Sequence, residues 1–210
     1  MVIDHCAYFL MNEHTMMYDA MRCAGRIAFP VFAFLIAEGF AYTHNRKRYF
    51  AQFLSFAILS EVPWYLLNGV DGTHNVIFTL ALGVVALAVL DKMKGNSILC
   101  GVAILSIACF VTWLGTDYEW RGILMIVVFN LLRNQNMNLP FSYGRMMQLF
   151  CTFPLMMHYG SIGALLACMV IFLYDGTRGF IKGNAAKYGF YAFYPAHLLL
   201  IWCTITFSAH

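Results

Sequence analysis

Long apolar stretches, each followed by a short turn that carries charge, recur along the whole of this sequence. A helix needs about 20 predominantly apolar residues to cross the hydrocarbon core of a bilayer. Of the 210 residues, 61% are hydrophobic and only 11% are charged, whereas roughly 25% of the residues of a soluble domain are charged. A chain with so few charges cannot cover a surface that faces water. We therefore expect an all-α membrane protein, a polytopic transmembrane helix bundle that forms one domain over residues 1–210.

The apolar stretches predict about eight or nine spans. They lie at residues 22–43, 49–67, 76–90, 97–114, 120–132, 146–158, 160–174 and 188–207, with an incomplete one at 1–11. As a helix, residues 1–11 rise only about 16 Å, which falls short of a hydrocarbon core about 30 Å thick. We therefore expect the first helix to be truncated at its N-terminus relative to a longer natural helix.

The charges between the expected spans alternate in sign. One set of turns carries basic residues, namely Arg46, Lys47, Arg48, Lys92, Lys94, Arg133, Arg145, Arg178, Lys182 and Lys187. The other set carries acidic residues, namely Glu13, Asp19, Asp71, Asp117 and Glu119. Cytoplasmic loops of membrane proteins are enriched in Lys and Arg, so the basic turns are expected in the cytoplasm. We expect a multi-pass protein of the bacterial inner membrane, in contact with the lipid bilayer and without a nucleic-acid partner.

Several charged or ionisable side chains fall inside the expected spans. They are Asp4, His5, Arg22, Arg26, Glu38, Glu61 and His197. A charged residue at the centre of a span costs about 2.5–3.5 kcal/mol, and such residues usually mark a functional site. Counting along the spans places four of them in one outer layer: Asp4, His5, Arg26 and Glu61. His197 lies slightly deeper. A histidine beside carboxylates and an arginine is the set of groups that a general base and its orienting partners need.

Other readings of these residues stay open. Arg26 could form only an interhelical ion pair with Glu61 or Asp4. His197 could be a histidine that merely packs between helices. Asp4 and His5 are adjacent, so their side chains point about 100° apart on a helix, and Glu61 or a backbone carbonyl could orient the imidazole instead. The same charges could line the pathway of a transporter or channel, or hold together a noncatalytic membrane scaffold.

The short basic turn Arg46–Arg48 has two readings as well. It can act only as a determinant of topology, or its side chains can bind phosphates at the cytoplasmic face. The seven cysteines show no metal-binding or disulfide pattern, and those in apolar runs are expected to be small buried hydrophobic residues. No metal site is predicted.

Short motifs spread over nearly the whole chain resemble, in order, those of the TraX family. They are Gly25–Pro30 with the run that follows to Phe40, Asn45–Lys47, Ser60–Pro63, Phe78–Gly83, Asp117–Phe129, Tyr174–Gly179 and Phe190–Leu198. The TraX family is similar to the wider acyltransferase family 3 of membrane enzymes. The resemblance implies an enzyme that moves an acetyl group from cytoplasmic acetyl-CoA to an acceptor amine or hydroxyl at the outer half of the membrane. The acceptor implied is a pilin-like peptide or a cell-envelope molecule.

The resemblance also implies roles for individual residues. Asp4 and His5 match a motif of the family's first helix, which makes His5 the implied catalytic histidine. It would take a proton from the acceptor, while Arg26 stabilises the developing oxyanion. The catalytic candidates are His5, Asp4, Arg26 and Glu61. The implied coenzyme-binding candidates are Arg46, Arg48 and Glu38. His197 is a further candidate polar site within the membrane.

Overall fold

The computed structural model describes residues 1–133, 141–177 and 183–208, without the side chains of residues 141–142 and 184–187. Within these ranges the chain is all-α, and the sole bridge between extended segments joins His74 to Thr116. The all-α prediction is confirmed. The basic residues Arg178, Lys182 and Lys187, and part of the motif at Tyr174–Gly179, lie outside the described side chains.

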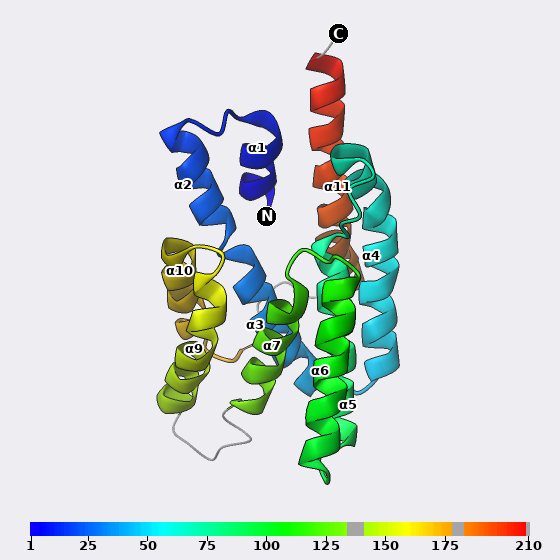
Figure 1. Cartoon of the computed structure of the whole chain (residues 1–210), viewed down its shortest axis with the longest axis vertical. Coiled ribbons are helices and arrows are strands. Elements are labelled where there is room, and N and C mark those ends of the chain that lie inside the picture. The colour runs from blue at the N-terminus through cyan, green and yellow to red at the C-terminus, as the bar shows by residue number, and fades with distance from the viewer. Residues whose placement is uncertain (134–140, 178–182, 209–210) are drawn as a thin grey trace.

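The helices lie side by side and run mostly along the long axis of the molecule (Figure 1). They are α1 (Val2–Leu10), α2 (Met16–Gly25), α3 (Ala28–Tyr42), α4 (Arg46–Asn68), α5 (Val76–Lys92), α6 (Ser97–Trp113), α7 (Glu119–Leu131), α9 (Phe141–Met157), α10 (Ser161–Phe172) and α11 (Asn184–Ser208). These bounds follow the expected spans to within a few residues at most ends. The principal exceptions are the start of α2, six residues before the expected span, and the start of α9, five residues before its span.

Polar capping residues set the starts of several helices. A side-chain oxygen accepts a hydrogen bond from a backbone N–H of the first turn at Thr15, Asn45, Asn75 and Asn96. Such a cap satisfies one of the N–H groups that have no partner within the helix. These four helices therefore begin at defined residues, and the short turns send successive helices back across the molecule.

The helix that was expected as one span at 22–43 is interrupted. It starts earlier, at Met16, and breaks between α2 and α3 at Arg26 and Ile27. Pro30 explains the position of the break, because a proline ring clashes with the carbonyl of the residue four positions earlier. That residue is Arg26, so the break places this side chain at the junction of two helices.

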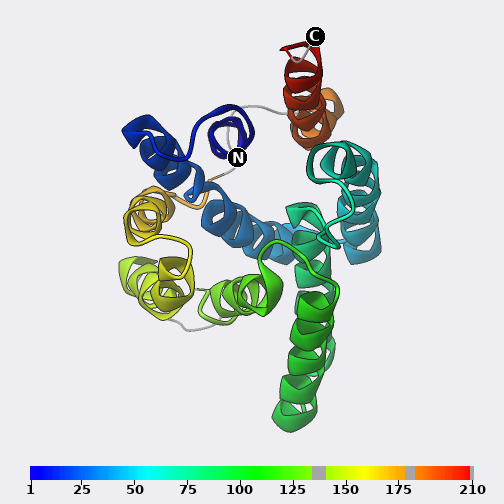
Figure 2. The same ribbon diagram turned by 45° about the horizontal axis from the view of Figure 1, so that its top comes forward.

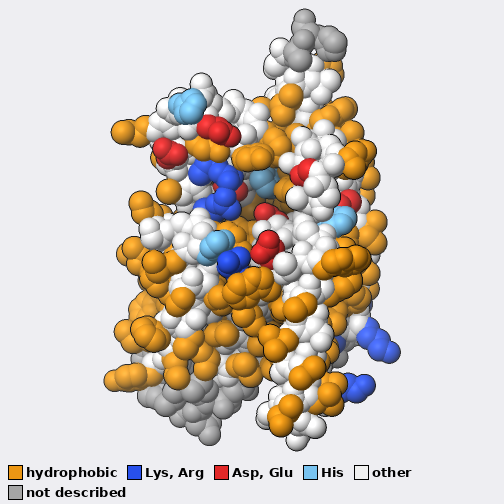
Figure 3. All heavy atoms as spheres, viewed as in Figure 1, with side chains coloured by type: hydrophobic (Ala, Val, Ile, Leu, Met, Phe, Trp, Pro, Cys, Tyr) orange, Lys and Arg blue, Asp and Glu red, His pale blue; other side chains and the backbone are white. Residues whose placement is uncertain are grey.

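The interior of the bundle centres on α3, α5 and α7. Its largest fully buried side chains include Phe29, Phe34, Met125 and Phe129. Large apolar side chains also cover the outside, among them Leu105, which is 60% exposed, and Phe150, which is 82% exposed. Figure 3 shows this apolar surface over most of one face of the molecule. Extensive apolar surface is rare on soluble monomers and is what a bilayer requires.

Three helical stretches among the described residues are long and apolar enough to cross a membrane. They are Met16–Tyr42, Arg46–Asn68 and Tyr188–Ser208. Two shorter apolar helices are Ser97–Trp113 and Ser161–Phe172. These helices indicate a multi-pass membrane protein.

The acidic and the basic connections lie in different halves of the bundle, as the alternation of charge predicts. In Figure 1 the connections α1–α2 and α4–α5 lie in the upper half and α6–α7 lies near mid-height, while α3–α4 and α5–α6 lie in the lower half. The tilted view in Figure 2 shows α1 beside α2, and α11 beside α4, as their contacts require. The first and last helices of the chain also contact each other. This contact brings residues from both ends of the sequence to one site.

Candidate functional site

A polar cavity of about 370 Å³ opens in the upper half of the bundle, between α1, α2, the end of α4 and the α6–α7 turn. Figure 3 shows blue, red and pale blue side chains gathered in a hollow among apolar ones on this face. The acidic, basic and histidine residues that line the cavity are Asp4, His5, Arg22, Arg26, Asp71, Asp117 and Glu119. Three of the four predicted catalytic residues, Asp4, His5 and Arg26, therefore share one cavity.

Asp4 forms its ion pair with Arg22. The guanidinium of Arg22 donates to the carboxylate of Asp4 at 2.7 Å, and it also lies 5.1 Å from the ring centre of Tyr8. Gly25 makes this packing possible, because a Cβ at that position would lie 2.2 Å from the Cβ of Asp4. The glycine that begins the Gly25–Pro30 motif thus allows α1 to approach α2 closely enough to form the pair.

Arg26 has a different set of neighbours. It lies within electrostatic reach of Asp4 and Asp117, and beside the hydroxyl group of Tyr118. The Tyr118 ring stacks on Phe29, with ring centres 3.5 Å apart. Arg26 is therefore held at the cavity by the α6–α7 turn as well as by α1, and an oxyanion at the cavity would meet a positive charge.

His5 is buried against aromatic rings on α4 and α11. Its centroid lies 6.3 Å from that of Trp64 and 6.0 Å from that of Tyr194. Its Nδ1 lies 2.9 Å from Nε2 of His197, and the planes of the two imidazoles are nearly parallel, with an interplanar angle of 10°. Nδ1 of His197 in turn lies 2.8 Å from the carbonyl oxygen of Phe193. The structure therefore places His197 in direct contact with His5, at the same site.

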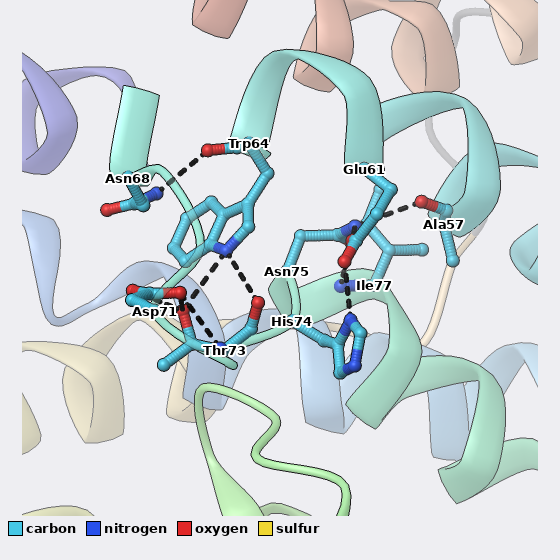
Figure 4. Close-up of polar contacts among 9 residues, drawn as sticks. All are labelled: Ala57, Glu61, Trp64, Asn68, Asp71, Thr73, His74, Asn75 and Ile77. Carbon is cyan, nitrogen blue, oxygen red and sulfur yellow. Dashed lines mark hydrogen bonds and ion pairs between the residues drawn. The ribbon is translucent and has the colours of Figure 1, made fainter. Parts of the chain in front are cut away.

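Glu61 forms its polar contacts outside the upper cavity. Its carboxylate accepts a hydrogen bond from the Asn75 amide at 2.6 Å and contacts the ring of His74 (Figure 4). The Asn75 amide also donates to the carbonyl oxygen of Ala57 at 2.9 Å. Glu61 is not among the residues that line the cavity. The four residues expected in one layer therefore do not form one group. Glu61 joins the start of α5 to α4 instead of contacting Arg26.

Asp117 was expected only as part of an outer loop. Its side chain faces the cavity, where partial desolvation by the surrounding protein raises the pKa of the carboxyl group to about 6, against the opposing effect of Arg26. The sequence signal for its role was the position of Asp117 at the start of a family-like motif, directly before a helix.

A second cavity, of about 620 Å³, lies at the opposite, lower end of the bundle. Arg46, Lys94 and Arg133 line it together with Asp91. Asp91 pairs with Lys94 at 2.6 Å and with Arg46, and these two contacts hold the pKa of its carboxyl group below the usual range. Even when Glu38, which pairs with Arg133, is counted beside Asp91, the three cations leave this cavity with a net positive charge.

The other two candidate coenzyme-binding residues, Glu38 and Arg48, do not line this cavity. Glu38 is buried, and both of its carboxylate oxygens lie 3.3 Å from Nε of the buried Arg133. Glu38 therefore holds a cavity residue in place. Arg48 donates its backbone N–H to the cap at Asn45, and it is not among the residues that line the cavity.

A third hollow in the bundle is an apolar groove of about 290 Å³. It runs between α3, α4, α5 and α11, and its lining includes Met1, Phe32, Tyr49, Tyr191 and Tyr194. Tyr194 packs edge-on against His5. Tyr49 lies one helical turn from Arg46, so the first turn of α4 borders both the groove and the lower cavity. Within the described ranges, no group of three or more His, Cys, Asp or Glu side chains could hold a metal ion.

Comparison with known proteins places the sequence in a family. The chain is 26% identical over 223 residues to a probable fimbrial assembly protein FimC, serogroup H1, of Dichelobacter nodosus, and the alignment covers 96% of this chain and 89% of that protein. No solved structure matches the chain. Residues 1–205 match the family described as TraX protein. Because this match spans almost the entire sequence, the chain belongs to the TraX family.

Proposed function

We propose that this chain is a membrane-bound acetyltransferase. It moves an acetyl group from cytoplasmic acetyl-CoA to an acceptor amine or hydroxyl at the outer half of the inner membrane. The TraX family is associated with pilin acetylation, and the similar protein of Dichelobacter nodosus carries the name of a fimbrial assembly protein. The proposed acceptor is accordingly a pilin-like peptide or another molecule of the cell envelope.

The position of His5 is the observation that carries this proposal. His5 lines the upper polar cavity and contacts Tyr194, which lines the apolar groove. A hydrophilic acceptor in the cavity and an acyl group in the groove would therefore meet at this imidazole. A histidine held at such a meeting point is suited to general base catalysis.

The proposed reaction is a direct transfer. A ring nitrogen of His5 takes a proton from the acceptor nitrogen or oxygen as that atom attacks the carbonyl carbon of acetyl-CoA. A new C–N or C–O bond forms and the C–S bond breaks, so the thiolate of coenzyme A leaves. The imidazolium then returns its proton to the thiolate, which gives the acetylated acceptor and free coenzyme A. Arg26 stabilises the negative charge that develops on the carbonyl oxygen.

The carboxylates of the upper cavity support an acceptor that carries an amino group. The cavity is lined by Asp71 of the α4–α5 turn, Asp117 of the α6–α7 turn and Glu119 at the start of α7. They would attract an ammonium group before it loses its proton to solvent, since opposite charges raise local concentration and association rate. Asp4 contributes by fixing Arg22, which leaves Arg26 to face the reacting group.

The lower cavity is the proposed site for the phosphates of the coenzyme. Arg46 and Arg133 line it directly, and guanidinium groups bind phosphates through paired hydrogen bonds. Arg48 lies two residues from Arg46 and adds positive charge at the same turn. Glu38 contributes through its ion pair with Arg133. From this cavity the thioester would reach His5 along the apolar groove.

This mechanism requires a defined orientation in the membrane, with about eight or nine crossings when the shorter helices are counted. A cysteine at Val70, which is 86% exposed in the α4–α5 turn, should react with an impermeant maleimide added to spheroplasts. A cysteine at Gly95, in the α5–α6 turn, should react only after the membrane is opened, because positive turns face the cytoplasm. The unsubstituted protein, with its seven native cysteines, gives the background. Equal labelling of both sites from outside would contradict the orientation.

Binding of the donor tests the function most directly. Acetyl-CoA should raise the unfolding temperature of the purified protein and acetate should not, because a ligand stabilises the state that binds it. Arg46→Ala should weaken this binding about tenfold or more, since a hydrogen bond to a charged group is worth about 1.5–3 kcal/mol. Lys47→Ala is the matched control, because it removes one charge from the same turn outside the cavity.

The same experiment separates the enzyme from its rivals. A transporter or a noncatalytic scaffold has no reason to prefer acetyl-CoA over acetate. The absence of any shift with acetyl-CoA would therefore reject the proposed donor. An equal loss of binding in Arg46→Ala and Lys47→Ala would reject the lower cavity as the phosphate site and leave only a general effect of charge.

A further inference from the structure

We infer that His197 is a positioning residue, which fixes the tautomer of His5 so that Nε2 of His5 is the nitrogen that accepts the proton. The inference rests on the proposed function only for the effect that His197 should have on the rate of acetyl transfer. The hydrogen-bond chain from which it is drawn is a property of the structure alone. It runs from the α11 backbone through two imidazoles joined by a hydrogen bond to the cavity.

The protons along this series of hydrogen bonds can be assigned by starting at the carbonyl group of Phe193. The carbonyl oxygen of Phe193 can only accept a hydrogen bond, so Nδ1 of His197, 2.8 Å away, must carry a proton. In a neutral imidazole the other nitrogen is then a bare acceptor. Nε2 of His197 lies 2.9 Å from Nδ1 of His5, which must therefore donate. His5 is left with its lone pair on Nε2.

The surroundings hold this arrangement in place. Both imidazoles are buried, at 9% exposure for His5 and 5% for His197. Water is therefore a poor substitute partner for Nδ1 of His5. Among the described residues, Nε2 of His5 has no hydrogen-bond partner, and the residue lines the upper cavity. A free ring nitrogen at a cavity is where an acceptor proton can be received.

The same hydrogen bonds also stabilise the positive charge that the reaction creates on His5. When Nε2 of His5 gains a proton, the ring becomes an imidazolium, and its Nδ1–H becomes a stronger donor to His197. A charge-assisted hydrogen bond is roughly twice as strong as a neutral one. His197 thus acts on His5 as a carboxylate acts on the histidine of a catalytic triad, by orienting the ring and stabilising its charged form. Asp4, beside His5 in sequence, is occupied by Arg22 and does not take this role.

The inference is tested with two variants of similar size. In His197→Gln the side-chain oxygen can still accept from Nδ1 of His5, whereas in His197→Leu nothing can. The tautomer of His5 is read from ¹⁵N chemical shifts of the full-length protein in nanodiscs, labelled with ring-¹⁵N histidine and assigned by comparison with His5→Gln. We expect Nδ1–H in the wild-type protein and in His197→Gln. We expect loss of this single tautomer in His197→Leu.

The rate of transfer should follow the tautomer. His197→Leu should lower kcat by about tenfold to a hundredfold, the effect typical of losing an outer partner that orients a functional histidine. KM for acetyl-CoA should stay unchanged, and His197→Gln should retain most of the activity. A residue that only packs α11 against α1 would not give this difference between glutamine and leucine.

Failure of the inference and failure of the function give different results. Nε2–H on His5 in the wild-type protein would overturn the inference even if no variant folded. An unchanged tautomer in folded His197→Leu would overturn it as well, whether or not the wild-type protein transfers acetyl groups. The expected tautomers without any transfer would support the positioning role of His197 and reject the proposed function alone.

Discussion

Replacing His5 with alanine should lower the rate of acetyl transfer by about 10²–10⁴-fold, the contribution typical of a general base. His5 lies between the upper cavity and the apolar groove, and no other histidine lines the cavity among the described residues. The loss should appear in kcat, while the binding of acetyl-CoA at the lower cavity should stay nearly unchanged. Initial rates at saturating acetyl-CoA, with a peptide amine as acceptor, measure the first quantity. Thermal stabilisation by acetyl-CoA measures the second.

His74→Ala is the matched control for this substitution. His74 also lies in the upper half of the bundle and also contacts another polar side chain, but its partner is Glu61 and it does not line the cavity. It should therefore retain nearly full activity. A loss of less than about tenfold in His5→Ala, with the fold intact, would show that His5 is not the base. An equal loss in both variants would indicate a general effect on the upper half of the bundle.

The positions of the helices could be predicted from the sequence, and physical reasons explain this success. Each apolar run ends in a short polar turn, and the turns supply capping residues such as Asn75 and Asn96. The break at Arg26 was not predicted, although Pro30 was visible. A proline inside a membrane helix can be accommodated by a kink, and the sequence does not tell a kink from an interruption.

The partners within the site were harder to predict, because the sequence does not say which helices are neighbours. His5 and His197 are 192 positions apart, so no periodicity links them. Glu61 lies at about the expected height, but its side of α4 faces the start of α5. There Asn75 binds both Glu61 and the carbonyl one turn earlier, at Ala57. The depth of a residue in the membrane could thus be predicted by counting along the sequence. The neighbouring helix that its side chain faces could be learned only from the packed structure.

The substitution Glu38→Ala should destabilise the folded protein by about 3–5 kcal/mol, the cost typical of removing one partner from a buried ion pair. Glu38 and Arg133 are both 8% exposed, so water cannot replace the lost carboxylate. Arg145 is buried nearby, over the ring of Phe34, and adds a second positive charge to this region. The free energy of unfolding in mixed micelles measures the effect. Glu13→Ala, an exposed glutamate in the α1–α2 turn, is the control and should change stability by less than about 0.5 kcal/mol.

A double substitution separates the structural role of Glu38 from a direct role at the coenzyme. Replacing a buried ion pair by apolar residues is often neutral for stability, so Glu38→Leu combined with Arg133→Leu should be more stable than Glu38→Ala. Because Arg133 lines the lower cavity, the double variant should nevertheless lose most of its stabilisation by acetyl-CoA. Recovery of the fold together with unchanged binding would remove Arg133 from the phosphate site. A Glu38→Ala protein as stable as the Glu13→Ala control would show that the Glu38–Arg133 pair does not hold the lower end of the bundle together.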